Sequence, residues 1–373
     1  MPDTRPQRFN VLDSFRGLSA LIIVVFHMQF SNSITEYIFF QNAKYFVDFF
    51  FVLSGFVLTH SYFKNVNISF KRFFISRTFR IFPLHLLMLF VFVLLELGKF
   101  FAYKYGVHFN HIPFSGETAI NQILPNALLL QSWLPHTIST SWNNPAWSIS
   151  VEYYLYFIFF ATFMLKNNFR KIIWFFISIA SFFIILQYSV STEILRGLSG
   201  FFAGAITYII YSHTHHIRNK YIYSFLEVTV LMAVYLVLVS TIKEKSVILS
   251  LLFCGSIFIF SYEKGIVSTL LRKKLFLFFG KISYSIYLVH ASIIVCLKAV
   301  VLIGQKLLNT QWTYMENDIR YIDFGSGFLN NFIVLLLLGI VVFVSNLTYR
   351  YIEVKGQKFG KKLNDNFGKK VLA

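Results

Sequence analysis

Apolar residues fill long stretches of this chain, and charged or turn-forming residues separate the stretches at similar intervals. A helix needs about 20 mostly apolar residues to cross the hydrocarbon core of a bilayer. Ten runs approach this length, and we expect a transmembrane helix in each. They are residues 18–30, 45–63, 81–97, 147–165, 172–190, 195–211, 223–241, 247–262, 282–303 and 328–347. The pattern predicts an all-α polytopic membrane protein.

The basic residues predict how these helices are oriented. Most of the 34 Lys and Arg residues lie near the two ends of the chain and in alternate connections between the runs. Because cytoplasmic loops carry the excess of Lys and Arg, both termini are expected in the cytoplasm. We therefore expect a multi-pass protein of the cell inner membrane, with a membrane domain over 1–353 and a short basic cytoplasmic tail over 354–373. The longest outside connection runs from about 102 to 146.

Composition supports the membrane assignment and narrows the partners. Hydrophobic residues make up 56% of the chain and charged residues only 13%, which is untypical of soluble domains. The net charge of +18 would suit nucleic acid, but the basic residues form short clusters between apolar runs instead of one basic face. Cys254 and Cys296 both lie in expected spans, where they indicate neither a disulfide framework nor a metal site. Membrane lipid is the expected surrounding partner, and we expect no nucleic acid partner and no metal.

The first apolar segment carries two ionisable side chains, Arg16 and His27. Eleven helical steps rise roughly 16 Å and place both side chains on one face. Ionisable residues inside a membrane usually face a cavity or a partner and mark a functional site. The spacing therefore indicates catalysis within the membrane, with a polar tie between helices as the alternative.

Two carboxylates fall in other expected spans. Asp48 lies near the outer end of the second span, and Glu152 lies roughly 7 Å below the outer edge in the fourth. A carboxylate beside His27 would orient the ring and fix its tautomer, as general-base catalysis requires. We expect both carboxylates to take part in catalysis. The alternative for both is a carboxylate near the start of its helix, at the interface for Asp48 and deeper for Glu152.

A cluster of arginines begins the third span on the expected cytoplasmic side. Arg77 and Arg80 are three residues apart and follow Arg72 closely. Guanidinium groups one helical turn apart suit a phosphate, so these residues are candidates for binding a phosphate group. Ordinary positive-inside anchoring is the alternative reading of the same charges.

Other patterns are typical of helix packing. Ser54 and Gly55 predict a notch of small residues, and Gly200 and Gly204 predict another in the segment RGLSGFFAGA. In KISYSIYLVH, the residues Tyr284, Tyr287 and His290 recur every three positions and share a helix face. Core packing with satisfied hydroxyls is the simplest interpretation of that face.

Six motifs, in this order, resemble those of the membrane-bound acyltransferase 3 family: LDSFRGLSALIIVVFH, VDFFFVLSGFVLTH, SRTFRIFPLH, NPAWSISVEYYLY, KISYSIYLVH and YRYIE. The resemblance implies ten membrane helices that take an acyl group, most often acetyl, from cytoplasmic acyl-CoA. It implies transfer to a sugar hydroxyl, often across the membrane, as in lipopolysaccharide O-antigens and exopolysaccharides. A polysaccharide or lipid-linked glycan is then the acceptor. A non-enzymatic lipid-linked glycan flippase or a polytopic polymerase is the competing interpretation.

Carried onto this chain, the family's arginine and histidine signature falls on Arg16 and His27, and its cytoplasmic arginine pair on Arg77 and Arg80. Acetyl-CoA is the expected donor. Val354 and Lys355 follow YRYIE where a basic residue and Pro are usual, so the last helix is expected to end differently. Some relatives carry an extracytoplasmic SGNH esterase-like domain, for which 354–373 offers no room. We expect direct transfer to the acceptor, or a separate extracytoplasmic transferase.

Overall fold

The computed structural model describes residues 8–63, 69–109, 111–188, 192–214, 219–317 and 319–370, with side chains up to 366. Its helices are α1 (Asn10–His27), α2 (Ile38–Gln41), α3 (Phe46–Tyr62), α4 (Phe70–Lys104), α5 (Ile123–Ala127), α6 (Ala146–Phe163), α7 (Asn167–Tyr188), α8 (Glu193–His213), α9 (Lys220–Val239), α10 (Lys245–Phe260), α11 (Ile266–Leu271), α12 (Lys274–Leu308), α13 (Gly327–Thr348) and α14 (Val354–Lys370). Four short 3-10 helices are Ile34–Glu36, Ala43–Tyr45, Gly116–Thr118 and Ile120–Gln122, and two strands are β1 (Thr313–Glu316) and β2 (Ile319–Ile322).

Each of the ten predicted segments corresponds to one helix of this series, and the expected all-α polytopic membrane fold is confirmed. Among the described residues, eight helices are long and apolar enough to cross a membrane. The other two of the ten are α6, with 18 residues, and α10, a shorter apolar helix of 16 residues. Both α4 and α12 have 35 residues and extend well beyond their apolar runs, because hydropathy marks only the apolar part of a helix.

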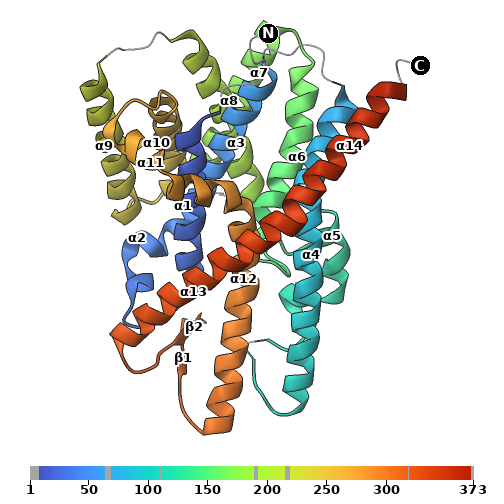
Figure 1. Ribbon diagram of the computed structural model, residues 1–373, viewed down its shortest axis with the longest axis vertical. Helices are drawn as coiled ribbons and strands as arrows, with labels where there is room; N and C mark the ends of the chain where they lie inside the picture. The colour runs from blue at the N-terminus through green and yellow to red at the C-terminus, as the bar shows by residue number, and fades with distance from the viewer. Residues whose placement is uncertain are drawn as a thin grey trace. The chain divides into compact units, whose positions relative to one another are not determined.

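The chain forms two compact units, whose helices and strands carry the labels of Figure 1. The first comprises Met1–Ser19, Asn42–Phe70 and Val151–Ser283. The second comprises Ala20–Gln41, Lys71–Ser150 and Tyr284–Ala373. Four helices contribute residues to both units: α1, α6 and α12, and α4 through Phe70 alone.

In the first unit, α3 and α8 pack with their backbones in close contact. A Cβ atom at Gly55 would overlap the carbonyl group of Phe201, and one at Gly204 would overlap the carbonyl group of Val52. Helix α8 also packs against α7 and α10. Small residues let membrane helices approach this closely, so the packing roles predicted for Gly55 and Gly204 are confirmed.

A buried carboxylate in the same unit caps the short helix α11. Glu227 of α9 is fully buried and accepts hydrogen bonds from the backbone N–H groups of Gly265 and Ser268, each at 3.0 Å, and from the Ser268 hydroxyl. A Cβ atom at Gly265 would collide with that carboxylate. The charge is thus satisfied by the first N–H groups of a helix, which is where a carboxylate is most stabilising.

In the second unit, the connection between α4 and α6 is folded against α4. Glu96 is almost fully buried and accepts hydrogen bonds from the Phe114 backbone N–H at 3.1 Å and the Thr118 hydroxyl at 2.8 Å. Trp142 of the same connection packs with Leu89 and Phe92 of α4 in a hydrophobic cluster. The long connection that the sequence indicates is therefore a structured segment with its own core.

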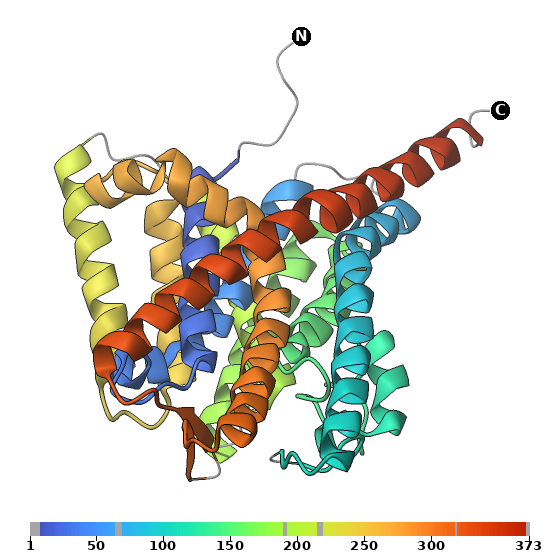
Figure 2. The ribbon, with the colours of Figure 1, turned by 60° about the horizontal axis from the view of Figure 1, so that its bottom comes forward.

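The last helices of the second unit form a continuous rod, which Figures 1 and 2 show in red. The YRYIE motif, Tyr349–Glu353, is a π-helical turn that leads from α13 directly into α14. Val354 stands where the family commonly has other residues, and without a proline the helix continues through this point. The residues expected as a tail are therefore helical up to Lys370.

Candidate functional site

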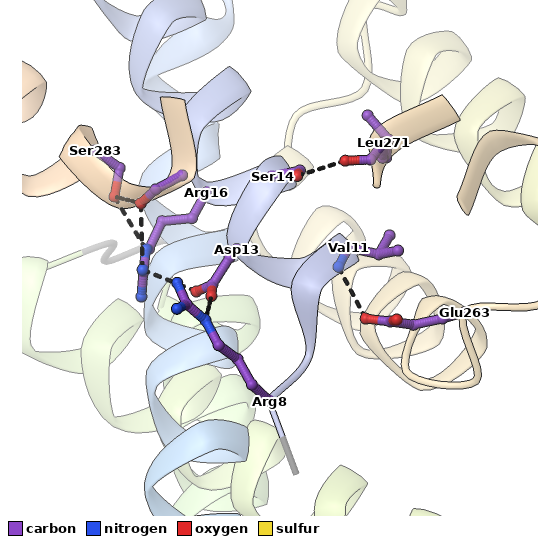
Figure 3. A network of polar contacts seen from close by, with 9 residues as sticks. Arg8, Val11, Asp13, Ser14, Arg16, Glu263, Leu271 and Ser283 are labelled. Carbon is purple, nitrogen blue, oxygen red and sulfur yellow. Dashed lines mark hydrogen bonds and ion pairs between the residues drawn. The ribbon is translucent and has the colours of Figure 1, made fainter. Parts of the chain in front are cut away.

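Arg16 is held near the start of α1 by three groups of the first unit (Figure 3). Its Nη2 donates to Asp13 Oδ1 at 2.9 Å and to the Gly280 carbonyl at 3.4 Å, and its Nε donates to the Ser283 hydroxyl at 3.0 Å. The other Asp13 oxygen accepts a hydrogen bond from Arg8 Nε at 2.6 Å. The side chain of Arg16 is 26% exposed, so its guanidinium remains accessible although it already has a carboxylate partner.

Close helix packing explains why Arg16 reaches α12 at this point. Cβ atoms at Gly17 and at Gly280 would overlap the backbone of the opposite helix, so α1 and α12 touch there within the first unit. The contact with Asp13, one turn earlier in α1, draws the guanidinium toward the N-terminal end of the helix.

His27 is the last residue of α1 and belongs to the second unit. The chain that follows it is hydrogen-bonded to β2. The Gln29 carbonyl accepts a hydrogen bond from the Ile322 N–H, and the Ser31 N–H donates to the Ile322 carbonyl, both at 2.9 Å. These bonds take the backbone groups that would otherwise extend the helix, so α1 ends at the histidine. The ring of His27 is partly exposed.

A second histidine lies beside His27. The ring centroids of His27 and His290 are 5.1 Å apart and their planes meet at 39°. His290 is completely buried in α12, and its Nδ1 lies 3.1 Å from the Ile286 carbonyl one turn earlier. The sequence places His290 on a packing face; the structure places it next to the proposed catalytic histidine.

Asp48 is fully buried in the first unit and has partners of its own. Arg196 Nε donates to Oδ1 at 2.9 Å, and the Ser246 hydroxyl donates to Oδ2 at 3.0 Å. The expectation was that Asp48 orients His27. Both of its oxygens instead accept hydrogen bonds from α8 and α10, and this favours a structural role as one half of a buried ion pair.

Glu152 also lies in the first unit, where it joins α6 to α3. Its Oε1 accepts hydrogen bonds from the Ser54 hydroxyl and from the Tyr156 hydroxyl, each at 2.5 Å. The side chain is only partly buried. Glu152 is therefore the centre of a local hydroxyl cluster, and the Ser54 hydroxyl is one of its members.

The arginines expected to bind the donor lie in the first third of α4. Arg72 is exposed, and Arg77 and Arg80 are half-buried. The Arg77 guanidinium lies 6.0 Å from the centroid of the Phe73 ring, which limits how it can point. All three belong to the second unit, as does His27.

Helix α14 runs beside the first part of α4 and carries further positive charge. Gly356 and Gly360 pack against Phe79, and the Asn364 side chain donates a hydrogen bond to the Arg72 carbonyl at 3.2 Å. The opposite side of α14 carries four exposed lysines. They are Lys355, Lys358, Lys361 and Lys362.

The described residues contain no group of three or more His, Cys, Asp or Glu residues that could hold a metal ion. His27 and His290 form a pair without a third ligand. The chemistry available at this pair is that of imidazole itself: accepting a proton, donating it, and orienting a neighbouring group.

Comparisons with known proteins agree with this picture of a membrane enzyme domain. The family model described as an acyltransferase domain (Acyl_transf_3) matches residues 9–350, and the chain belongs to this acyltransferase 3 family. Acyltransferase MdmB of Streptomyces mycarofaciens is 34% identical over 116 residues, a stretch that covers 30% of this chain and 26% of that protein's length. No solved structure matches this chain significantly.

Proposed function

We propose that this protein is an integral inner-membrane O-acyltransferase that moves an acetyl group from cytoplasmic acetyl-CoA to a hydroxyl of an envelope polysaccharide, such as an O-antigen or exopolysaccharide. Family membership supports the acyltransferase class. The observation that carries the assignment is the imidazole of His27, partly exposed at the end of α1 beside a second, buried imidazole. A base of this kind can activate a hydroxyl.

The reaction we propose needs one base and one acceptor hydroxyl. His27 takes the proton of the hydroxyl as its oxygen attacks the thioester carbonyl, which forms a tetrahedral oxyanion. The carbon–sulfur bond then breaks, and the proton on His27 passes to the departing CoA sulfur. An ester and free CoA are the products, and no oxidant, metal or further reactant is required.

The donor is held through its phosphates. Arg77 and Arg80 lie one turn apart on α4, near exposed Arg72, and guanidinium groups bind phosphate through paired hydrogen bonds. Arg16, roughly 16 Å before His27 along α1, is a further candidate for the phosphates of CoA. We assign no chemical step to Asp48 or Glu152, because the hydrogen bonds that their carboxylates accept explain both residues structurally.

The acceptor is a polysaccharide or lipid-linked glycan, reached directly or through a separate extracytoplasmic transferase. Family frequency supports O-antigen or exopolysaccharide, and the membrane lipid surrounds the helices. The multi-pass architecture is in keeping with a site that receives its donor on one side of the membrane and its acceptor on the other.

Transfer of radiolabelled acetyl from acetyl-CoA into the glycan fraction of membranes tests this function. Label is expected in glycan with the intact protein and should disappear with His27→Ala at equal expression, because the base is lost. His111→Ala, in the connection between α4 and α6, is the matched control and should transfer normally. Equal label with and without His27 would remove it from the mechanism, and acetyl-CoA-independent glycan transport would favour a flippase.

A further inference from the structure

His290 carries a nitrogen that the rest of the second unit leaves unpaired. The side chain is 0% exposed, and Nε2 has no hydrogen-bond partner among the described residues. Burying a polar atom without a hydrogen bond costs free energy, so a donor placed against this nitrogen would be stabilising.

The tautomer of His290 follows from the contact between its Nδ1 and a backbone carbonyl. The Ile286 carbonyl, 3.1 Å from Nδ1, can only accept, so Nδ1 carries the hydrogen. In the neutral ring Nε2 is then a bare acceptor with a lone pair. The ring centroid of Tyr287 is 6.0 Å from that of His290. The Tyr287 hydroxyl already forms a hydrogen bond with the Ser148 hydroxyl at 2.8 Å.

His27 is the group placed to use that lone pair. Its ring centroid is 5.1 Å from that of His290, close to the separation at which two imidazoles share an N–H···N hydrogen bond. The rings are tilted by 39°. The His27 side chain is partly exposed, so its ring has room to turn toward His290 Nε2.

We propose that His290 is a positioning residue, whose buried Nε2 accepts a hydrogen bond from a ring N–H of His27 and so fixes the tautomer in which the other His27 nitrogen faces the acceptor hydroxyl. This inference rests on the proposed function and deepens it. In many catalytic sites a carboxylate orients the histidine ring, and here the imidazole of His290 would orient the ring of His27. No proton moves to His290 in this step.

Two amide substitutions separate this role from simple packing. In His290→Gln the amide oxygen comes near the position of Nε2 and can accept from His27. In His290→Asn the amide nitrogen comes near Nδ1 and can keep the bond to the Ile286 carbonyl, but the acceptor is lost. We expect the kcat of acetyl transfer to fall less than about 5-fold in the glutamine variant and about 10–100-fold in the asparagine variant, as for outer partners of functional histidines.

The Michaelis constant for acetyl-CoA provides an independent readout. Since His290 orients a base and does not bind the donor, the KM should stay within about twofold of wild type in both variants. His85→Gln is the matched control, because His85 is another buried histidine with one bond to a carbonyl, that of Asn126, and one unpartnered nitrogen. Its ring contact is with Phe82, and normal kcat is expected.

The outcomes are distinct. The positioning role would be overturned if the folded asparagine and glutamine variants were equally active, whether both keep activity or both lose it. Either result would leave the proposed function intact. If the asparagine variant does not fold, His290→Ala with added imidazole replaces it: restored turnover is expected, and a folded variant that imidazole does not restore contradicts the proposal. Wild-type membranes without acetyl transfer would instead refute the proposed function itself.

Discussion

Buried charged residues in this protein have closely fitted partners. The Asp48 carboxylate accepts one hydrogen bond on each oxygen, from Arg196 and from Ser246. In an apolar surrounding, removing one member of a buried ion pair costs more than the pair itself contributes, because an uncompensated charge remains. The role of Asp48 can therefore be tested through its partner.

Asp48→Asn should destabilise the protein by about 3–5 kcal/mol, because it leaves the Arg196 guanidinium buried without its counter-charge. The double variant Asp48→Asn with Arg196→Met should recover much of this loss, since both charges are then absent. Thermal unfolding in detergent measures the stability of each variant.

Acetyl transfer by the same variants distinguishes a structural Asp48 from a catalytic one. If Asp48 only supports the fold, activity returns together with stability in the double variant. A double variant that is stable but inactive would return Asp48 to the catalytic machinery.

Sequence reasoning locates the ionisable residues of the site but not their partners. The spacing of Arg16 and His27 on one helix could be read directly, and α1 carries both. The partner of His27 could not be predicted from the sequence, because helices far apart in the chain come into contact only in the folded protein. Arg196, in a segment interpreted as a packing motif, and His290, on a face interpreted as core, were missed for that reason.

At the scale of whole helices, hydropathy predicts where a helix lies better than where it ends. The run at 81–97 lies within α4, which begins at Phe70 and contains Pro83. Helix ends depend on hydrogen bonds from other segments, as the bonds between β2 and the chain after His27 show. The glycine positions were more informative, because a missing side chain marks where two backbones approach closely.

Gly204→Ala should destabilise the protein by about 1–3 kcal/mol, since the added methyl group overlaps the Val52 carbonyl and pushes α3 away from α8. Gly255→Ala in α10 is the matched control. A Cβ atom there meets nothing within 4 Å, so helix propensity should leave stability unchanged or raise it by up to about 1 kcal/mol. Equal unfolding temperatures for the two variants would contradict the close α3–α8 contact.

At the scale of the whole molecule, the distribution of Lys and Arg predicts which connections face the cytoplasm. Hydropathy alone does not determine this orientation. The exposed lysines of α14 belong to the end expected in the cytoplasm, whereas the connection between α4 and α6 belongs to the opposite side. This orientation is required if the donor comes from the cytoplasm and the acceptor from outside.

Single cysteines test the orientation. In a background with Cys254→Ser and Cys296→Ser, Ile120→Cys and Lys361→Cys introduce one thiol each at an exposed position. A membrane-impermeant maleimide should label the first in intact cells and the second only after the membrane is opened. Labelling in the reverse order would invert the topology and with it the direction of transfer.

The capping of α11 by Glu227 constrains how this protein is made. The groups that satisfy the carboxylate lie 38 to 41 residues further along the chain, so α9 leaves the ribosome before its charge has a partner. The interval is longer for Asp48, because its partner Arg196 is synthesised 148 residues later. During synthesis each carboxylate therefore has to be protonated, hydrated or shielded by the insertion machinery until the later helices arrive.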